Sequence, residues 1–179
     1  MDCKDHISKE SKILDLGCGS AIVAKCFEEF FNADVLGVDI KDMRIEDIPF
    51  KIIDKNNLPF SDNSFDIVLI AYVLHHCEDP IFLLKEAQRV SKDKIIIYED
   101  LPDGFFSGLF CKMHSFIFHY FFQENVFSGK IERKRGESFK NIKEWKQVFK
   151  DLNLTLIDEK KASLNIMPIN KKLFVLKKA

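Results

Sequence analysis

Apolar runs and amphipathic segments alternate along the first hundred residues of the chain. The apolar runs show no regular alternation of polar and apolar positions, as expected for strands that are buried on both faces of a sheet. They cover Lys12–Leu16, Ala33–Ile40, Phe50–Asp54, Phe65–Ala71 and Lys94–Tyr98. Apolar residues at helical spacing lie between them, at about 20–31 and 80–90. Strands that alternate with helices at this spacing predict a parallel α/β sheet.

Both of these helices have a candidate N-cap. Ser20 is a plausible cap for the first helix, and Asp79 followed by Pro80 places aspartate at the cap and proline at the first helical position of the second. Helical spacing predicts that the first helix turns five apolar side chains inward: Val23, Cys26, Phe27, Phe30 and Phe31.

The C-terminal part of the chain predicts one more helix and two strands. The segment Asn141–Leu152 is amphipathic, and apolar strands follow at 154–158 and 172–176, with a connection short enough for antiparallel pairing. The connection from Lys41 to Pro49 is shorter than the roughly twelve residues that a parallel crossover usually needs. It therefore predicts at most one or two helical turns there.

A phenylalanine-rich segment separates these two parts. Residues 105–127 contain eight phenylalanines but are interrupted by Lys112, His114 and His119, which argues against a transmembrane helix. Its phenylalanine-rich composition predicts one or two very apolar helices inserted after the fifth strand. We interpret 101–140 as a lid in a single domain that spans 1–179.

Composition narrows the class of protein. The five cysteines form no CxxC pair and are odd in number, which favours reduced thiols in the cytoplasm and argues against a disulfide framework or a zinc site. The N-terminal residues do not resemble a signal peptide. Residues 129–179 are basic, but no cluster interleaves aromatic residues with charge as nucleic-acid sites do. We therefore favour solvent-exposed lysines over a nucleic-acid site.

Candidate chemistry begins at Asp15-Leu16-Gly17-Cys18-Gly19-Ser20, a turn between the first strand and the first helix. Its glycines can take positive φ and let a ligand lie against bare backbone, which suits either a dinucleotide or S-adenosylmethionine. A dinucleotide fingerprint needs a third glycine where Ile22 stands, and no Gly-Lys-Ser/Thr follows as in a P-loop. Asp39 ends the second strand, where a carboxylate could bind ribose hydroxyls.

The motif 15–20 resembles the first motif of class I S-adenosylmethionine-dependent methyltransferases. Val38-Asp39-Ile40 resembles the acid of that family's second strand. Asp54 with 58–66 resembles the signature between the third and fourth strands of the small-molecule (type 11) branch. Leu74-His75-His76 and the helix up to Val90 match the next helix of that branch. These motifs span residues 12–100 in the family's order.

The resemblance implies a Rossmann-like seven-stranded sheet of order 3-2-1-4-5-7-6, with the seventh strand antiparallel and helices on both sides. The implied cofactor is S-adenosyl-L-methionine. Asp15, Gly17 and Gly19 would surround its amino-acid end and ribose, and Asp39 would hold the ribose hydroxyls. Ile40, Asp54 and Lys55 would contact the adenine. Ala71 and Tyr72 would lie near the methyl sulfonium. No metal is implied.

The acceptor is less determined than the cofactor. The phenylalanine-rich segment favours a small apolar acceptor, namely a lipid, prenyl or aromatic molecule, and allows a lid that touches a membrane surface. An oxygen acceptor needs a base, for which the candidates are His75, His76, Asp100, His114 and His119. The alternative is a non-catalytic methyltransferase-like subunit that binds or scaffolds. RNA methylation is disfavoured, because no Asn-Pro-Pro-Tyr-type motif follows the fourth strand.

Overall fold

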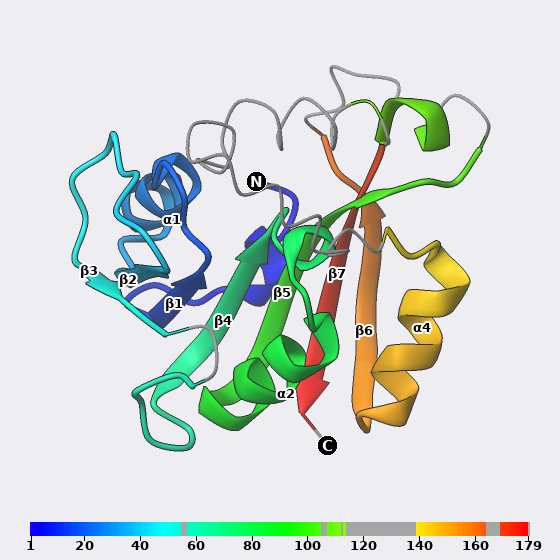
Figure 1. Ribbon diagram of the computed structural model, residues 1–179. Helices are drawn as coiled ribbons and strands as arrows, with labels where there is room; N and C mark the ends of the chain where they lie inside the picture. Colours follow the sequence, from blue (N-terminus) through cyan, green and yellow to red (C-terminus); the bar gives the residue numbers. More distant parts are fainter. Residues whose placement is uncertain (55–56, 105–106, 112, 114–138, 164–168, 179) are drawn as a thin grey trace.

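The computed structural model describes residues 1–54, 57–104, 107–111, 113, 139–163 and 169–178. Its centre is one seven-stranded sheet of order β3-β2-β1-β4-β5-β7-β6 (Figure 1). The strands are β1 (Lys12–Leu16), β2 (Asp34–Asp39), β3 (Phe50–Ile52), β4 (Phe65–Ala71), β5 (Ser91–Leu101), β6 (Leu154–Lys161) and β7 (Asn170–Lys178). The first five run parallel, and β7 lies antiparallel to both β5 and β6. The predicted order and the antiparallel seventh strand are confirmed.

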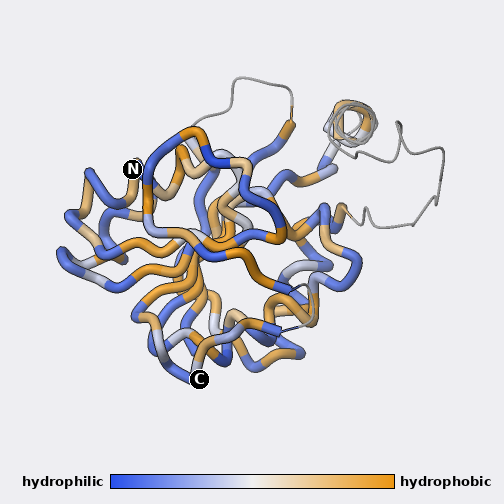
Figure 2. The backbone as a smooth tube through the Cα atoms, turned by 60° about the vertical axis from the view of Figure 1, so that its left-hand side comes forward, coloured by the Kyte–Doolittle hydropathy of each residue, from blue (hydrophilic) through white to orange (hydrophobic). Residues whose placement is uncertain are grey.

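Helices cover both faces of the sheet. They are α1 (Ile22–Phe31), α2 (Pro80–Val90) and α4 (Ile142–Asp151), with short 3-10 turns η1 (Lys4–His6) and η2 (Leu74–His76). Because strand side chains alternate between faces, the sheet has two cores. One core packs against α2 and α4, and the other packs against α1 and the N-terminal segment. Figure 2 shows the apolar residues gathered along the central strands, with hydrophilic turns at the periphery.

The core beneath α4 contains a chain of aromatic rings. Trp145 and Phe149 project from α4, and the Phe149 ring lies 5.4 Å from that of Phe174 on β7. The helix begins at a capping box, in which the Asn141 side chain accepts from the backbone N–H of Glu144 and the Glu144 side chain accepts from that of Asn141. The predicted amphipathic helix and its inward face are confirmed.

The first helix begins differently from the prediction. Its N-cap is Ala21, whose φ of 64° is left-handed and whose side chain forms no cap, so the prediction of Ser20 as cap is wrong. The Ser20 carbonyl instead accepts from Ile45 N at 3.0 Å. Ala24, Phe27 and Phe31 are buried against the sheet and Val23 is partly buried beside them, which confirms that part of the predicted inward face. Cys26 and Phe30 are exposed, so their inward placement is wrong.

The connection between β2 and β3 contains no helix, as its length predicts. Arg44 organises it. The guanidinium donates to both carboxyl oxygens of Asp42 at 2.9 Å and to the Ile48 carbonyl at 2.7 Å. The hydrogen bonds from Arg44 lower the pKa of Asp42 to about 2. A short loop can thus keep a fixed shape beside the glycine turn.

The predicted lid falls largely on residues 105–106, 112 and 114–138, which lie outside the described part of the chain, so the single-domain-with-lid division stays a prediction. Within the described residues, no helix has the length and apolar character needed to cross a bilayer.

Replacing Phe149 by alanine tests the aromatic core. Phe149 is 2% exposed and loses its contacts with two rings, so the free energy of unfolding should fall by about 3–5 kcal/mol. The matched control is Phe30→Ala, because Phe30 is 59% exposed and should cost less than about 1 kcal/mol. Urea denaturation followed by circular dichroism measures both variants. Equal losses would contradict the described packing.

Candidate functional site

The carboxyl ends of β1, β2, β4 and β5 lie along one edge of the sheet, where parallel α/β folds bind ligands. The register brings the predicted residues together there. Leu16 pairs with Val38, so the glycine turn leaves β1 beside the end of β2. Ala71 at the end of β4 pairs with Tyr98 of β5. Most of the predicted cofactor residues therefore surround one region.

The glycine turn needs its glycines for two different reasons. Gly17 has φ of +80°, and a Cβ placed on it would lie 2.7 Å from a methyl group of Val73. Gly19 has φ of +49° but open space around it. The first glycine permits close packing of the loop after β4, whereas the second leaves an uncovered backbone against which a ligand can lie.

Asp39 holds this turn in place. Its Oδ2 accepts from the backbone N–H of Gly19 at 2.9 Å, and its Oδ1 accepts from that of Ile40 at 2.7 Å. The Val38 carbonyl accepts from the N–H groups of Gly17 and Cys18 at 2.8 and 3.1 Å. A carboxylate has about four acceptor positions, so Asp39 can still accept from a pair of hydroxyls.

Asp15 is a buried acid without a partner. Its side chain is 1% exposed, and neither carboxyl oxygen has a hydrogen-bond partner among the described residues. Burial, and then the negative charge of Asp39, raise the pKa of Asp15 to about 7. Buried polar atoms without partners are rare in native proteins, and a cluster of donors or a cation supplied by a ligand would satisfy both oxygens.

These features fit S-adenosylmethionine, which carries an ammonium group, a sulfonium and a ribose diol. A positive ammonium suits the unpartnered carboxylate of Asp15, and a diol suits the remaining acceptor positions of Asp39. Ile40 is 45% exposed beside them, as an apolar surface for a purine would be. Asp54 forms an isolated bridge with Asn57, and Lys55 lies outside the described residues.

The end of β4 carries an unusual backbone. Tyr72 has φ of +60°, which is uncommon for a non-glycine residue, and its N–H donates to the Tyr98 carbonyl at 2.8 Å. The Nζ of Lys171 lies 4.2 Å from the centre of the Tyr72 ring. Burial and the nearby carboxylate of Asp100 raise the pKa of Tyr72 to about 12, so its hydroxyl stays protonated at neutral pH.

The two acids near the carboxyl end of β5 face opposite sides of the sheet. Asp100 is buried, and its Oδ1 accepts from the Nζ of Lys171 at 2.7 Å. Glu99 points to the other face and contacts the Nδ1 of His75. Sequence reasoning missed Lys171, although the antiparallel register of β7 pairs it directly with Asp100. A carboxylate bound by lysine is a weak candidate for a free base.

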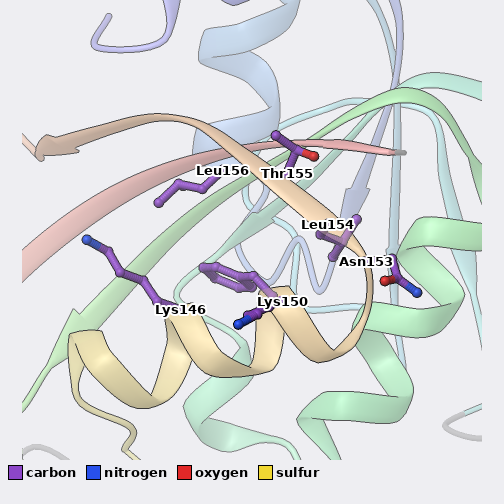
Figure 3. A pocket seen from close by; sticks show the side chains of 7 residues that line it. Lys146, Lys150, Asn153, Leu154, Thr155 and Leu156 are labelled. Carbon is purple, nitrogen blue, oxygen red and sulfur yellow. The ribbon is translucent and has the colours of Figure 1, made fainter.

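The other predicted bases are distributed as follows. His75 is buried, with a ring centroid 4.0 Å from that of His76. His114 and His119 lie outside the described residues, so their role stays a prediction. A separate shallow pocket of about 450 Å³ lies between α4 and the edge strand β6 (Figure 3). None of the predicted site residues lines it.

Comparison with known proteins agrees with this geometry. The model of a methyltransferase domain family matches residues 14–98. An uncharacterized protein of Methanocaldococcus jannaschii is 33% identical over 156 residues, which are 84% of this chain and 74% of that protein. The demethylmenaquinone methyltransferase of Thermotoga maritima is 32% identical over 138 residues, which are 69% of this chain and 59% of that enzyme.

A solved structure shares the fold. The magnesium protoporphyrin IX methyltransferase of Synechocystis, with S-adenosylhomocysteine bound, has a TM-score of 0.68, with 12% identity over 99% of this chain and 78% of that one. The chain spans only 38% of the length of another relative, an uncharacterized methyltransferase of Schizosaccharomyces pombe. Sheet order, glycine turn and relatives agree: residues 14–98 match the methyltransferase domain family, and the chain has the fold of class I S-adenosylmethionine-dependent methyltransferases.

Asp15 makes the ligand-free protein sensitive to pH. Its pKa is raised from 3.8 to about 7 by folding, so the folded state binds this proton more tightly than the unfolded chain does. The stabilisation is complete below the unfolded pKa and is lost as pH rises to about 7. The variant Asp15→Asn carries no charge and should therefore raise the free energy of unfolding at pH 8 by roughly 4 kcal/mol, with a smaller gain of about 2 kcal/mol at pH 5.

Urea denaturation of both proteins at the two pH values checks this expectation. A variant that is less stable than the parent at pH 8 would show that the Asp15 carboxylate is satisfied in the ligand-free protein.

Proposed function

We propose that this protein is an S-adenosylmethionine-dependent methyltransferase that methylates a small, apolar acceptor. The main observation in favour of this cofactor is the buried carboxylate of Asp15, which has no hydrogen-bond partner among the described residues. It lies next to a glycine turn whose Gly19 N–H donates to Asp39. A site whose acids suit a cation and a hydroxyl pair matches this cofactor better than it matches a dinucleotide. Membership of the family supports the same choice.

The cofactor supplies an electrophilic methyl group on a sulfonium. The residues of this chain bind and orient it. Asp15 binds the positively charged amino-acid end, Asp39 accepts from the ribose hydroxyls, and the backbone around Gly17 and Gly19 lies against the ligand. Ile40 contacts the adenine, and Asp54 with Lys55 binds its edge. Ala71 and Tyr72 lie beside the reacting methyl. Alignment and exclusion of water are the main tasks of such a site.

Two observations support an apolar acceptor. The segment after β5 is rich in phenylalanine, and it begins directly after the acids at the carboxyl end of that strand. The Thermotoga relative is named for demethylmenaquinone, and the Synechocystis neighbour is named for magnesium protoporphyrin IX. We infer that the segment 101–140 encloses the acceptor and contacts a membrane surface when the acceptor is a lipid.

Calorimetry tests the cofactor. S-adenosylhomocysteine should bind with a dissociation constant well below about 1 mM, which corresponds to only about 4 kcal/mol. Asp39→Asn leaves one acceptor oxygen in place of two and should weaken binding by about ten-fold or more. Asp34→Asn is the matched control, because Asp34 lies on the same strand but is exposed at its opposite end. A parent protein that fails to bind would refute the proposed function.

Transfer of tritium from labelled S-adenosylmethionine tests the acceptor class. The probes are 1-naphthol, farnesol and oleic acid as apolar acceptors, with glycine and bulk tRNA as polar ones. Label should enter the organic phase with at least one apolar probe and stay out of both polar ones. Binding of the cofactor without transfer to any probe would favour the non-catalytic alternative, and labelled tRNA would show that the acceptor class is wrong.

A further inference from the structure

A lysine ammonium group lies between a buried carboxylate and an aromatic ring at the carboxyl edge of the sheet. The Nζ of Lys171 donates to Oδ1 of Asp100 at 2.7 Å and lies 4.2 Å from the centre of the Tyr72 ring. The Asp100 side chain is 5% exposed, and that of Lys171 is 20% exposed. Within the described part of the chain, Asp100 forms its ion pair with Lys171 alone. A carboxylate and an aromatic face are also the two groups with which proteins bind free ammonium compounds.

These three residues lie on the same face of the sheet as the acid that suits the cofactor. The strand order is β1, β4, β5, β7, so Tyr72, which follows β4, lies between Asp15 of β1 and the pair formed by Asp100 of β5 and Lys171 of β7. Alternation along β1 and β5 places both acids on the face that packs against α1. The ion pair therefore lies on the side of Tyr72 away from the glycine turn, which is the side left for an acceptor.

The next lysine of β7 forms an ion pair of a different kind. Lys172 contacts Glu159 at 2.8 Å, and Lys146 contacts the same carboxylate at 2.6 Å. The side chains of Lys172 and Glu159 are 27% and 21% exposed. Loss of Lys172 would leave Glu159 with a counter-ion and with water. Loss of Lys171 would leave the carboxylate of Asp100 buried beside an aromatic face, and such a carboxylate favours the binding of another cation.

We propose that Lys171 is a specificity-determining residue, whose ammonium group occupies a cation site formed by Asp100 and Tyr72 and thereby excludes positively charged acceptors. This proposal rests on the proposed function. An amine that enters beside Tyr72 meets the positive charge of Lys171 and finds the carboxylate already bound. An uncharged acceptor meets neither cost. The chain thus discriminates between acceptors through a repulsive charge as well as through favourable contacts.

Two ligands with the same aromatic body test the exclusion. 1-Naphthylmethylamine carries an ammonium group at pH 7, and 1-naphthalenemethanol carries a hydroxyl group in its place. Protein loaded with S-adenosylhomocysteine should bind the alcohol about ten-fold more tightly than the amine, or better, as calorimetry measures. Lys171→Ala should reverse this preference by a similar factor. Lys172→Ala is the matched control and should keep the preference of the parent.

A small cation tests the site without any acceptor. n-Propylammonium carries the atoms that Lys171→Ala removes beyond Cβ, and n-propanol is its uncharged counterpart. The midpoint of thermal unfolding of Lys171→Ala should be higher in n-propylammonium than in n-propanol, because a ligand that binds only the folded state stabilises it. A variant that is unfolded alone should regain its circular dichroism spectrum in n-propylammonium. The parent and the double variant Asp100→Asn/Lys171→Ala, which lacks the carboxylate, should show no difference between the two compounds.

Several results would count against the role of Lys171. A parent that binds the amine as tightly as the alcohol would overturn the exclusion. An unchanged preference in Lys171→Ala, or failure of n-propylammonium to stabilise that variant, would show an ion pair that serves the fold alone. If the parent binds neither naphthyl ligand, the result with n-propylammonium decides. A parent that does not bind S-adenosylhomocysteine would instead refute the proposed function itself.

Discussion

The hydrogen bonds from Gly19 and Ile40 to the Asp39 carboxylate are the constraint on which the site depends. They join the turn after β1 to the end of β2, and they exist because the two strands pair in register, Leu16 beside Val38. A slip of one residue would send every side chain of β2 to the other face. The hydrophobic pattern of two buried strands therefore determines the geometry of the glycine turn, which lies outside both strands.

The same arrangement brings two acids near one another. Asp15 is fully buried and feels the negative charge of Asp39, which adds to the effect of burial on its pKa. A folded protein keeps such a pair only if something compensates elsewhere in its packing, or if function requires it. The left-handed backbone at Tyr72 is another local cost at the same edge. Both features mark the carboxyl edge as the part of the molecule that is shaped for a ligand.

Sequence patterns predicted the elements better than their local chemistry. Buried strands, the Asp79 cap of α2 and the amphipathic helix α4 follow from patterns within a few residues, and the structure confirms them. The order of the sheet came from the resemblance to a family. The Ser20 cap failed because hydrogen bonds to Val38, distant in sequence, force the chain through a left-handed turn at Ala21.

The acids at the end of β5 show a second limit. Alternation along a strand predicts that neighbours such as Glu99 and Asp100 diverge, yet it cannot say what each one meets. Lys171 reaches Asp100 only through the antiparallel register of β7, and His75 reaches Glu99 only because η2 crosses the extension of β5. These partners depend on long-range pairing, which no local pattern contains.

The position of β7 has a consequence for the order of folding. β6 pairs with no described strand other than β7, and β7 also covers the free edge of β5. During synthesis, residues 154–161 leave the ribosome before Asn170–Lys178, the strand that joins them to the sheet. The Lys171 contact with Asp100 forms in the same late step. The parallel half of the sheet can assemble first, but the carboxyl end of β5 gains its second neighbour only when the last strand inserts between β5 and β6.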